Sequence, residues 1–373
     1  MTTQPNDDVV LVTGATGQVG TALCARLLKD PNTRVMALVR ARDDADLQAR
    51  LAQLRQRCGG DAERLLGVRG DVSAPGLGLD ETARETVASL VTSVVHAAAS
   101  VRFDLPAKDA AQSNINAVTH VLDVARTLLE RGRLRRLDHV STAYVAGQHA
   151  GRFHEHEADI GQQFRNTYEW SKLQGELRVM AAMQQGLPAA IHRPSIVVGD
   201  STSGATRAFN VLYWPLKVYV RGWWKTFPGS PDARVDIVPV DYVADRLARL
   251  RRNPATLGQT FHLAAGDAAK TVRQLAAHIQ TVTGGPPVRY MDQQRYRRFG
   301  RPLVAPFLAV TKRGRAILRG GEAYMPYFVH NPVFDTARLC SVLGPDAAAP
   351  PVLDYLERVV RFAMAEDFGD RAR

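Results

Sequence analysis

Residues 9–20, VVLVTGATGQVG, decide the fold of this chain. The first four are apolar and mostly β-branched without polar alternation, which predicts a strand buried on both faces of a parallel sheet. Glycines at every third position follow, and helical spacing begins at Thr21. Such glycines allow a tight turn, a close approach of backbone to a pyrophosphate, and close helix–strand contact. The stretch therefore predicts a dinucleotide-binding site formed by Gly14, Thr16, Gly17, Gln18, Val19 and Gly20.

Length and composition indicate a globular protein with more than one lobe. The 373 residues exceed the usual size of a single domain, and the hydrophobic fraction of 45% suits a large core. The first residues, MTTQPNDD, lack the basic start and apolar run of a signal peptide. No apolar run reaches the roughly 20 residues that cross a bilayer. We therefore expect a cytoplasmic protein without a transmembrane segment.

Cysteines and histidines do not indicate a metal site. Cys24, Cys58 and Cys340 lack metal-ligand spacing, which is typical of a reducing compartment, and Cys24 is expected to pack in the core. His154 and His156 alternate with carboxylates in FHEHEAD, but alternate residues of a loop face apart. We expect no bound metal.

The net charge of +11 favours an acidic partner, and one region carries much of it. Residues 289–319 hold a single acid, Asp292, and nine basic residues: Arg289, Arg295, Arg297, Arg298, Arg301, Lys312, Arg313, Arg315 and Arg319. No nucleic-acid-binding motif accompanies them, so we expect no nucleic acid but a phosphorylated cofactor or carrier. A solvated arginine-rich surface is the alternative.

A second buried strand is predicted at residues 34–40, RVMALVR, and it ends in a base. An acid at this position holds the ribose 2′-hydroxyl of NAD, whereas a base accommodates the 2′-phosphate of NADP. Arg40, with Arg42 close by, therefore favours NADP. Asp43 and Asp44 are the observation against it.

Residues 66–72 and 91–99 predict a third and a fourth strand. Asp71 and Val72 end the third strand, and Asp71 is expected near the adenine. The small side chains of Ala97, Ala98 and Ala99 end the fourth and let the backbone lie close to the cofactor. Because strands alternate with helical patterns, we predict an α/β fold with a doubly wound parallel sheet, the Rossmann arrangement.

Two further segments carry side chains suited to proton transfer. Residues 137–144, LDHVSTAY, predict a strand that ends in the hydroxyls of Ser141 and Thr142. In YEWSK, Tyr168 and Lys172 lie at i and i+4 on one helical face. A lysine beside a phenol favours the phenolate, so we expect Lys172 to lower the pKa of Tyr168.

Taken together, these motifs resemble the extended short-chain dehydrogenase/reductase superfamily. More narrowly, the chain resembles the branch of fatty acyl-CoA reductases and thioester reductase domains, in which VRFD and DIVPVDYVA are the discriminating matches. The matching stretches, in the family's order, are TGATGQVG (13–20), LVRA (38–41), GDVSAPGLGL (70–79), HAAASVRFDLP (96–106), HVSTAYV (139–145), YEWSK (168–172), HRPSIVVGD (192–200) and VDIVPVDYVA (235–244).

This resemblance implies a role for each matching residue. Tyr168 is the proton donor, Lys172 holds the nicotinamide ribose, and Thr142, supported by Ser141, binds the carbonyl oxygen. Asn114 helps to order the site, although Ala117 stands where the family usually has glycine.

The same resemblance places Arg193, Pro194, Ser195 and Ile196 beside the nicotinamide; a structural ion pair is the alternative for Arg193. The implied cofactor is NADPH. The implied reaction reduces an acyl thioester, delivered as acyl-CoA or on an acyl or peptidyl carrier protein, to an aldehyde or further to an alcohol.

After Asp200 the composition changes. Residues 209–228 are dense in aromatic residues interleaved with Lys217, Arg221 and Lys225, which fits a lobe core, the wall of an acyl tunnel or a peripheral membrane contact. We expect an NADP-binding domain at 1–200, to which 235–265 return. A smaller, mostly helical, C-terminal substrate-binding lobe is expected at 201–234 and 266–373.

Three classes of function are compatible with these residues. The first is a thioester reductase. The second is other chemistry on the same scaffold: a nucleotide-sugar epimerase or dehydratase, or a hydroxysteroid-type dehydrogenase. The third is a non-catalytic NADP-binding regulator, which the intact set of Thr142, Tyr168 and Lys172 disfavours.

Overall fold

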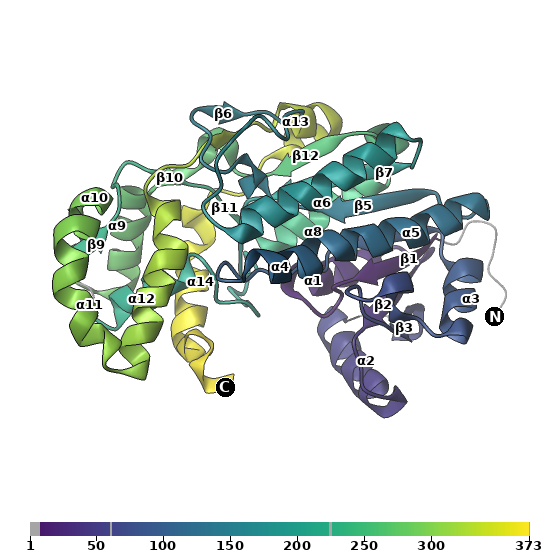
Figure 1. The fold of residues 1–373 in the computed structure, drawn as a ribbon, viewed down its shortest axis with the longest axis horizontal. Helices are drawn as coiled ribbons and strands as arrows, with labels where there is room; N and C mark the ends of the chain where they lie inside the picture. Colours follow the sequence, from purple (N-terminus) through teal and green to yellow (C-terminus); the bar gives the residue numbers. More distant parts are fainter. Residues whose placement is uncertain (1–7, 60–61, 224–225, 373) are drawn as a thin grey trace.

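The computed structural model describes residues 8–59, 62–223 and 226–372, and a seven-stranded parallel sheet lies at its centre (Figure 1). The strand order is β12-β7-β5-β4-β1-β2-β3, which confirms the predicted doubly wound sheet. The strands are β1 (Asp8–Thr13), β2 (Thr33–Val39), β3 (Leu65–Arg69), β4 (Ser93–His96), β5 (Arg136–Val140), β7 (Ala189–Pro194) and β12 (Thr260–Leu263). Because β1 lies between β2 and β4, the strand order reverses there, and ligands bind at such a switch point.

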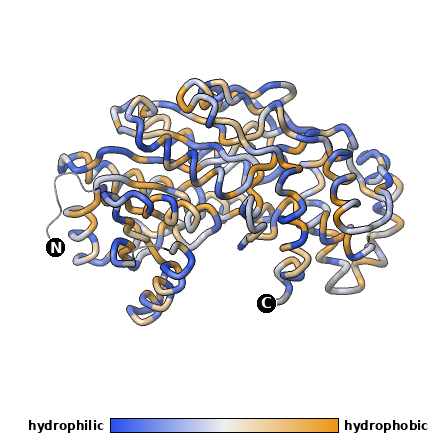
Figure 2. Tube along the Cα trace, turned by 180° about the vertical axis from the view of Figure 1, so that it is seen from behind, coloured by the Kyte–Doolittle hydropathy of each residue, from blue (hydrophilic) through white to orange (hydrophobic). Residues whose placement is uncertain are grey.

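Helices cover both faces of the sheet, as the continuous apolar run in β1 predicts. Val10 and Val12 pack toward α1 and α8, whereas Val9 and Leu11 pack toward α5 and α6. Hydrophobic and hydrophilic residues alternate along the covering helices (Figure 2). These helices are α1 (Gln18–Leu27), α2 (Asp44–Cys58), α3 (Glu81–Leu90), α5 (Ala117–Glu130), α6 (Thr167–Gln184) and α8 (Val240–Arg251).

Strand β4 is shorter than predicted. It ends at His96, so Ala97, Ala98 and Ala99 lie in the loop that follows. The reason is that β1 ends at Thr13, whose carbonyl accepts from the Ala97 N–H (3.2 Å) and whose hydroxyl accepts from the Ala98 N–H (3.3 Å). Beyond this point Gly14 turns the chain away, and the ladder has no further partner.

The helices at one end of the molecule form a second body (Figure 1). Its core includes Tyr213, Leu216, Met325, Leu356 and Val360. The helices are α7 (Tyr213–Val220), α9 (Val272–Thr283), α10 (Gln293–Arg295), α11 (Arg301–Ala309), α12 (Lys312–Tyr324) and α14 (Leu353–Ala365). Helix α12 packs closely on α7, because Gly320 has no side chain and leaves room for the ring of Trp214. A Cβ on Gly320 would lie 1.9 Å from Nε1 of that ring.

The remaining elements connect these two bodies. Short helices α4 (Ala107–Ala110) and α13 (Ala337–Leu343) lie beside the sheet domain. Strands pair two by two: β6 (Arg152–Phe153) with β15 (Val333–Phe334), β8 (Ile196–Val198) with β11 (Ile237–Pro239), β9 (Thr226–Pro228) with β14 (Arg289–Met291), and β10 (Arg234–Val235) with β13 (Lys270–Thr271). Across the described ranges, no helix has the length and hydrophobicity that a bilayer span requires.

The aromatic stretch at 209–228 packs largely inside this second body. Tyr213, Leu216 and Val218 are buried, and Phe209 and Trp214 pack against the core. These side chains therefore form part of the lobe core, which is one of the three alternatives expected for this stretch. Trp224 and Lys225 lie outside the described residues.

A buried ionic network fixes β5, the strand that leads to Ser141 and Thr142. The Asp138 carboxylate accepts two hydrogen bonds from Arg136 (2.8 and 2.7 Å), one from Arg251 (3.0 Å) and one from His192 (2.8 Å). Burial alone raises the pKa of Asp138, but Arg136, His192 and Arg251 outweigh it and hold the pKa well below the usual range. The network joins β5 to β7 and to the end of α8.

We expect Asp138→Asn to lower the free energy of unfolding by about 3–5 kcal/mol, because the buried cations lose their counter-charge. Urea denaturation at neutral pH measures this. The matched control is Asp123→Asn on the surface of α5, where the carboxylate is 58% exposed, and we expect a change within about 0.5 kcal/mol.

The same network predicts a pH dependence. A folded-state pKa below the unfolded value of about 3.9 stabilises the protein above that pH, and the stabilisation is lost as the pH falls. The parent should therefore lose more free energy of unfolding than Asp138→Asn between about pH 5 and pH 3. Equal losses would assign the acid sensitivity to other carboxylates.

Candidate active site

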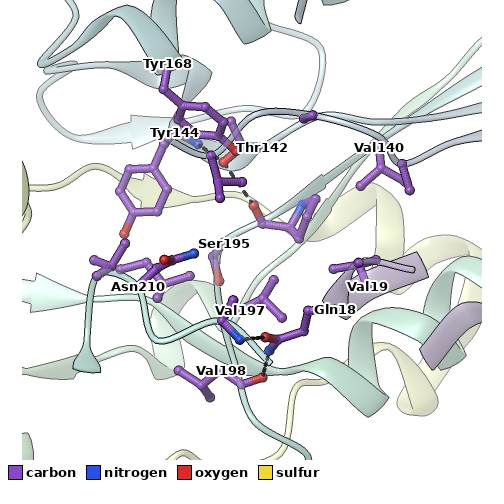
Figure 3. A pocket seen from close by; sticks show the side chains of 18 of the residues that line it. Gln18, Val19, Val140, Thr142, Tyr144, Tyr168, Ser195, Val197, Val198 and Asn210 are labelled. Carbon is purple, nitrogen blue, oxygen red and sulfur yellow. Dashed lines mark hydrogen bonds between the residues drawn. The ribbon is translucent and has the colours of Figure 1, made fainter. Parts of the chain in front are cut away.

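A cavity of about 390 Å³ lies at the carboxyl ends of β1, β4, β5 and β7, where the strand order reverses (Figure 3). Most residues predicted for the site line it, although they come from five separate segments of sequence. These residues are Gly14, Thr16, Gly17, Gln18, Val19, Gly20, Ala97, Ala99, Ser141, Thr142, Tyr168, Lys172, Pro194, Ser195 and Ile196.

The glycine turn leaves no room for side chains. Gly14 has φ 71°, and a Cβ there would lie 2.6 Å from the Ala98 nitrogen. A Cβ on Gly20 would lie 2.1 Å from the Gly14 oxygen. Helix α1 begins after Gly17 without a side-chain cap and without an acid in its first turn. Its free N–H groups and helix dipole therefore fit the phosphates of a dinucleotide.

Gln18 ties this helix to the chain that enters the lobe. Its Nε2 donates to the Val198 carbonyl (2.9 Å), and its Oε1 accepts from the Thr206 hydroxyl (2.7 Å) and the Ala208 N–H (3.1 Å). Figure 3 shows the amide between α1 and Val198. Gln18 thus orders the cavity wall through both ends of its amide.

Thr142, Tyr168 and Lys172 meet at one side of the cavity. Thr142 follows β5, and its Oγ1 accepts from the Tyr144 N–H (3.2 Å) and donates to the Pro194 carbonyl (3.4 Å). Tyr168 lies beside it in Figure 3, close enough for hydrogen bonding with Thr142 to lower the pKa of the phenol. Lys172, one turn further along α6, is buried and donates from Nζ to the Val140 carbonyl (2.8 Å).

Burial is the largest influence on the pKa values of Tyr168 and Lys172. It raises the pKa of Tyr168 to about 12, against the lowering effect of the Thr142 hydrogen bond. It lowers the pKa of Lys172 to about 8, although Glu176 acts in the opposite direction. The expectation that Lys172 lowers the pKa of Tyr168 is wrong here, because the ammonium is directed to the Val140 carbonyl. Tyr168 is held as a neutral phenol that can donate a proton.

Asn114 and Ser141 complete the surroundings. Asn114 Nδ2 donates to the Ser171 hydroxyl (2.9 Å), and its Oδ1 accepts from the Ser100 N–H (2.8 Å). It therefore positions α6 against the loop after β4 and does not line the cavity. Ser141 lines the cavity, and its buried hydroxyl has no hydrogen-bond partner in the described part of the chain. A ligand oxygen is a suitable partner for it.

The residues predicted for the adenosine end lie outside this cavity, at the ends of β2 and β3. The Arg40 side chain is 80% exposed and lies 3.8 Å from Asp71. Asp43 caps helix α2, and Asp46 accepts from the Arg42 N–H (3.0 Å). Asp43 and Asp46 are thus both occupied by hydrogen bonds at the start of α2. Val72 follows Asp71, and its carbonyl contacts Nδ1 of His120 (2.9 Å).

Arg193 does not contact the cavity, so the prediction of a cofactor contact by its side chain is wrong. The guanidinium is fully buried, pairs with Glu176 and donates to the Glu157 carbonyl (2.7 Å). The ion pair joins β7 to α6, because Arg193 lies on the strand and Glu176 lies on the helix. Pro194, Ser195 and Ile196, by contrast, line the cavity.

Three aromatic side chains of the cavity had no predicted role: Phe103, Tyr144 and Tyr327. The rings of Phe103 and Tyr168 lie 5.3 Å apart, and those of Tyr144 and Tyr327 lie 5.0 Å apart. They form an aromatic wall in the same cavity as the Thr142 and Tyr168 hydroxyls. VRFD and STAY contain two of them, so the signal was present in stretches recognised for other reasons.

The two histidines of FHEHEAD, His154 and His156, lie outside the cavity and contact other residues. His154 Nδ1 lies 2.9 Å from the Asp335 carboxylate, and its ring stacks on that of His156. Within the described ranges, no group of three or more metal-ligating side chains occurs.

The fold and this site define an extended short-chain dehydrogenase/reductase. Residues 12–247 match the family of NAD-binding domains described as "Male sterility protein", and the chain belongs to that family. The resemblance drawn from the sequence is thereby confirmed.

Two curated relatives and one solved structure show the range of similar proteins. The chain is 28% identical to the nonribosomal peptide synthetase asaC of Aspergillus flavus, over 69% of this chain and 26% of that protein. It is also 28% identical to the fatty acyl-CoA reductase wat of Drosophila melanogaster, over 65% of this chain and 53% of the relative. The chain thus spans about a quarter to a half of these relatives. The terminal R domain from the myxalamid PKS-NRPS pathway has the same fold, with 23% identity, a TM-score of 0.83, and coverage of 98% of this chain and 92% of that one.

Proposed function

We propose that this protein reduces an acyl thioester to an aldehyde with NADPH. The observation that carries the proposal is the pairing of the Thr142 and Tyr168 hydroxyls in a cavity that continues from the glycine turn. The similarity to a fatty acyl-CoA reductase and to a reductase domain supports the choice of a thioester. Residues 1–200 and 235–265 form the cofactor domain in this proposal, and 201–234 and 266–373 form the substrate lobe.

The chain's own groups activate the carbonyl. Thr142 and Tyr168 donate hydrogen bonds to the thioester oxygen, where negative charge develops. The glycine turn and Lys172 would hold the reduced nicotinamide dinucleotide, which would supply the hydride for the carbonyl carbon. Tyr168 gives its proton to the oxygen, and the product is a hemithioacetal. When that hydroxyl proton moves to sulfur, the C–S bond breaks and releases thiol and aldehyde; a second reduction of the aldehyde gives the alcohol.

Tyr168→Phe should lower turnover by about a hundredfold or more, because a positioned acid is lost, while the affinity for NADPH stays nearly unchanged. NADPH oxidation is measured with acyl-CoAs, acyl carrier proteins and UDP-sugars as substrates. Undiminished turnover by the variant would remove Tyr168 from the mechanism. Conversion of UDP-sugars alone would favour an epimerase or dehydratase.

The preference for NADPH rests on Arg40. Its exposed guanidinium lies at the end of β2, next to Asp71, in the position that meets the 2′-substituent of the ribose in this fold. A charged hydrogen bond of this kind contributes about 1.5–3 kcal/mol.

Arg40→Ala should therefore weaken NADPH binding by roughly ten- to a hundredfold and leave NADH binding nearly unchanged. Fluorescence titration with both cofactors measures this. Arg126→Ala, an exposed arginine on α5, is the control and should alter neither affinity. Equal affinity of the parent for NADPH and NADH would refute the preference.

The basic residues at 289–319 are proposed to receive the acidic side of the substrate carrier. Arg295, Arg297, Arg298 and Arg319 are exposed on α10, α12 and the π-helical segment Tyr296–Gly300 between α10 and α11. Arg301 differs, because it pairs with Glu322. The side chains of Lys312 and Arg313 lie outside the described part of the structure.

Two further observations support a macromolecular carrier. Phe299, Leu303 and Val310 are 60%, 71% and 79% exposed in the segment from the π-helical turns at 296–300 to the end of α11, so apolar side chains follow the exposed arginines directly along the chain. Helix α12, which carries Arg319, also reaches the cavity wall, because the ring of Tyr324 at its end lies 5.4 Å from that of Phe103.

Reversing Arg297 and Arg298 to Glu should raise the KM for a carrier-bound or CoA-bound acyl group by roughly tenfold, with little change in kcat. The penalty should shrink as salt rises, because exposed charges are screened. The control pair Arg126→Glu and Arg131→Glu changes the same charge on α5. If a short N-acetylcysteamine thioester were affected as strongly as the full substrate, the surface would be structural.

A further inference from the structure

A second cavity lies inside the lobe and contains none of the catalytic residues. Its volume is about 640 Å³, within the range of roughly 300–1,000 Å³ that small-molecule sites occupy. Helices α7 and α9 and strands β9 and β14 surround it. Most of its lining is apolar and includes Leu216, Phe227, Leu275, Ile279, Val288 and Phe328.

The lining of the lobe cavity has few polar side chains that could bind a charged ligand. Its described polar side chains are Tyr219, Thr226 and Arg289. The Tyr219 hydroxyl donates to the Pro286 carbonyl (2.8 Å), and Arg289 is exposed. With no acid among these residues and one base at the edge, the cavity suits an uncharged apolar group.

Leu212 forms a wall common to this lobe cavity and the catalytic cavity. Two consecutive residues, Tyr327 and Phe328, likewise line the catalytic and the lobe cavity respectively. The residue before Leu212, Val211, has φ 20°, a positive value that β-branched residues rarely adopt. Backbone strain of this kind is concentrated at functional sites. Because Leu212 lines both cavities and the neighbours Tyr327 and Phe328 line one each, only single buried side chains separate the lobe cavity from the catalytic cavity.

We infer that the lobe cavity receives the apolar acyl chain of the thioester, with Leu212 at its entrance. The inference rests on the proposed function, which places the carbonyl at Thr142 and Tyr168. A thioester has two arms, and the polar thiol arm must reach CoA or the carrier outside. The acyl arm gains from apolar burial, since each buried methylene strengthens binding by about fourfold. Long and medium acyl chains are thus the substrate class that this cavity selects.

The test compares neighbouring alanines on α9. Ala276 lines the lobe cavity, whereas Ala277 is exposed on the same helix. Ala276→Trp fills the cavity and should lower the ratio of kcat/KM for dodecanoyl-CoA over butanoyl-CoA by roughly tenfold or more. Ala277→Trp should leave that ratio unchanged. Ala276→Leu should give an intermediate decrease, which keeps the test valid if the larger side chain prevents folding.

A binding measurement separates this inference from the proposed activity. The fluorescent fatty acid cis-parinaric acid should bind the parent and Ala277→Trp alike, and should bind Ala276→Trp at least tenfold more weakly. This pattern without any thioester reduction would retain the acyl cavity and refute the reductase proposal. Reduction with a chain-length ratio that Ala276→Trp and Ala276→Leu leave unchanged would overturn the acyl cavity and retain the reductase.

Discussion

The close approach of backbone at the glycine turn is the constraint on which the site depends. At Gly14 and Gly20 the space for a Cβ is already filled by the backbone of Ala97, Ala98 and Gly14 itself. This contact brings the ends of β1 and β4 and the start of α1 together at the reversal of strand order. The open helix N-terminus, the small side chains after β4 and the cavity all follow from that single approach.

The side chains of Thr142, Tyr168 and Lys172 are positioned by buried polar groups from outside the cavity. Asp138 and its cations fix β5 before Thr142, and Asn114 links α6, with Tyr168 and Lys172, to the loop after β4. The Arg193–Glu176 pair joins β7 to the same helix. Removing one partner of such a network leaves a buried charge or polar group unpaired and destabilises the fold. The positions of the cavity side chains therefore depend on each network being complete.

The sequence was sufficient to predict the sheet, the glycine turn and the segments that bring Thr142, Tyr168 and Lys172 to one cavity, because strand, turn and helix patterns depend on short-range spacing. It was insufficient wherever the answer depends on what surrounds a residue. Arg193 lies one residue before the end of β7, beside the site, but its partner Glu176 could be found only from the packing of α6. The pKa of Tyr168 follows from burial, which the spacing to Lys172 does not reveal. The aromatic wall joins Phe103 to Tyr327, and the lobe cavity joins α7 to α9, so both required the tertiary structure.

The pairing of β8 with β11 sets Ile196 opposite Ile237 and so holds both ends of the first lobe segment side by side. A segment closed in this way changes its entropic cost only slowly with length, by about 0.6 kcal/mol for each doubling. Insertions and deletions between these strands therefore cost little free energy, provided that they avoid the residues between 206 and 213 that contact Gln18 or line the cavity. In evolutionary terms, the lobe is the part of the molecule free to diversify: new substrate preferences can arise there while the reaction chemistry is inherited unchanged.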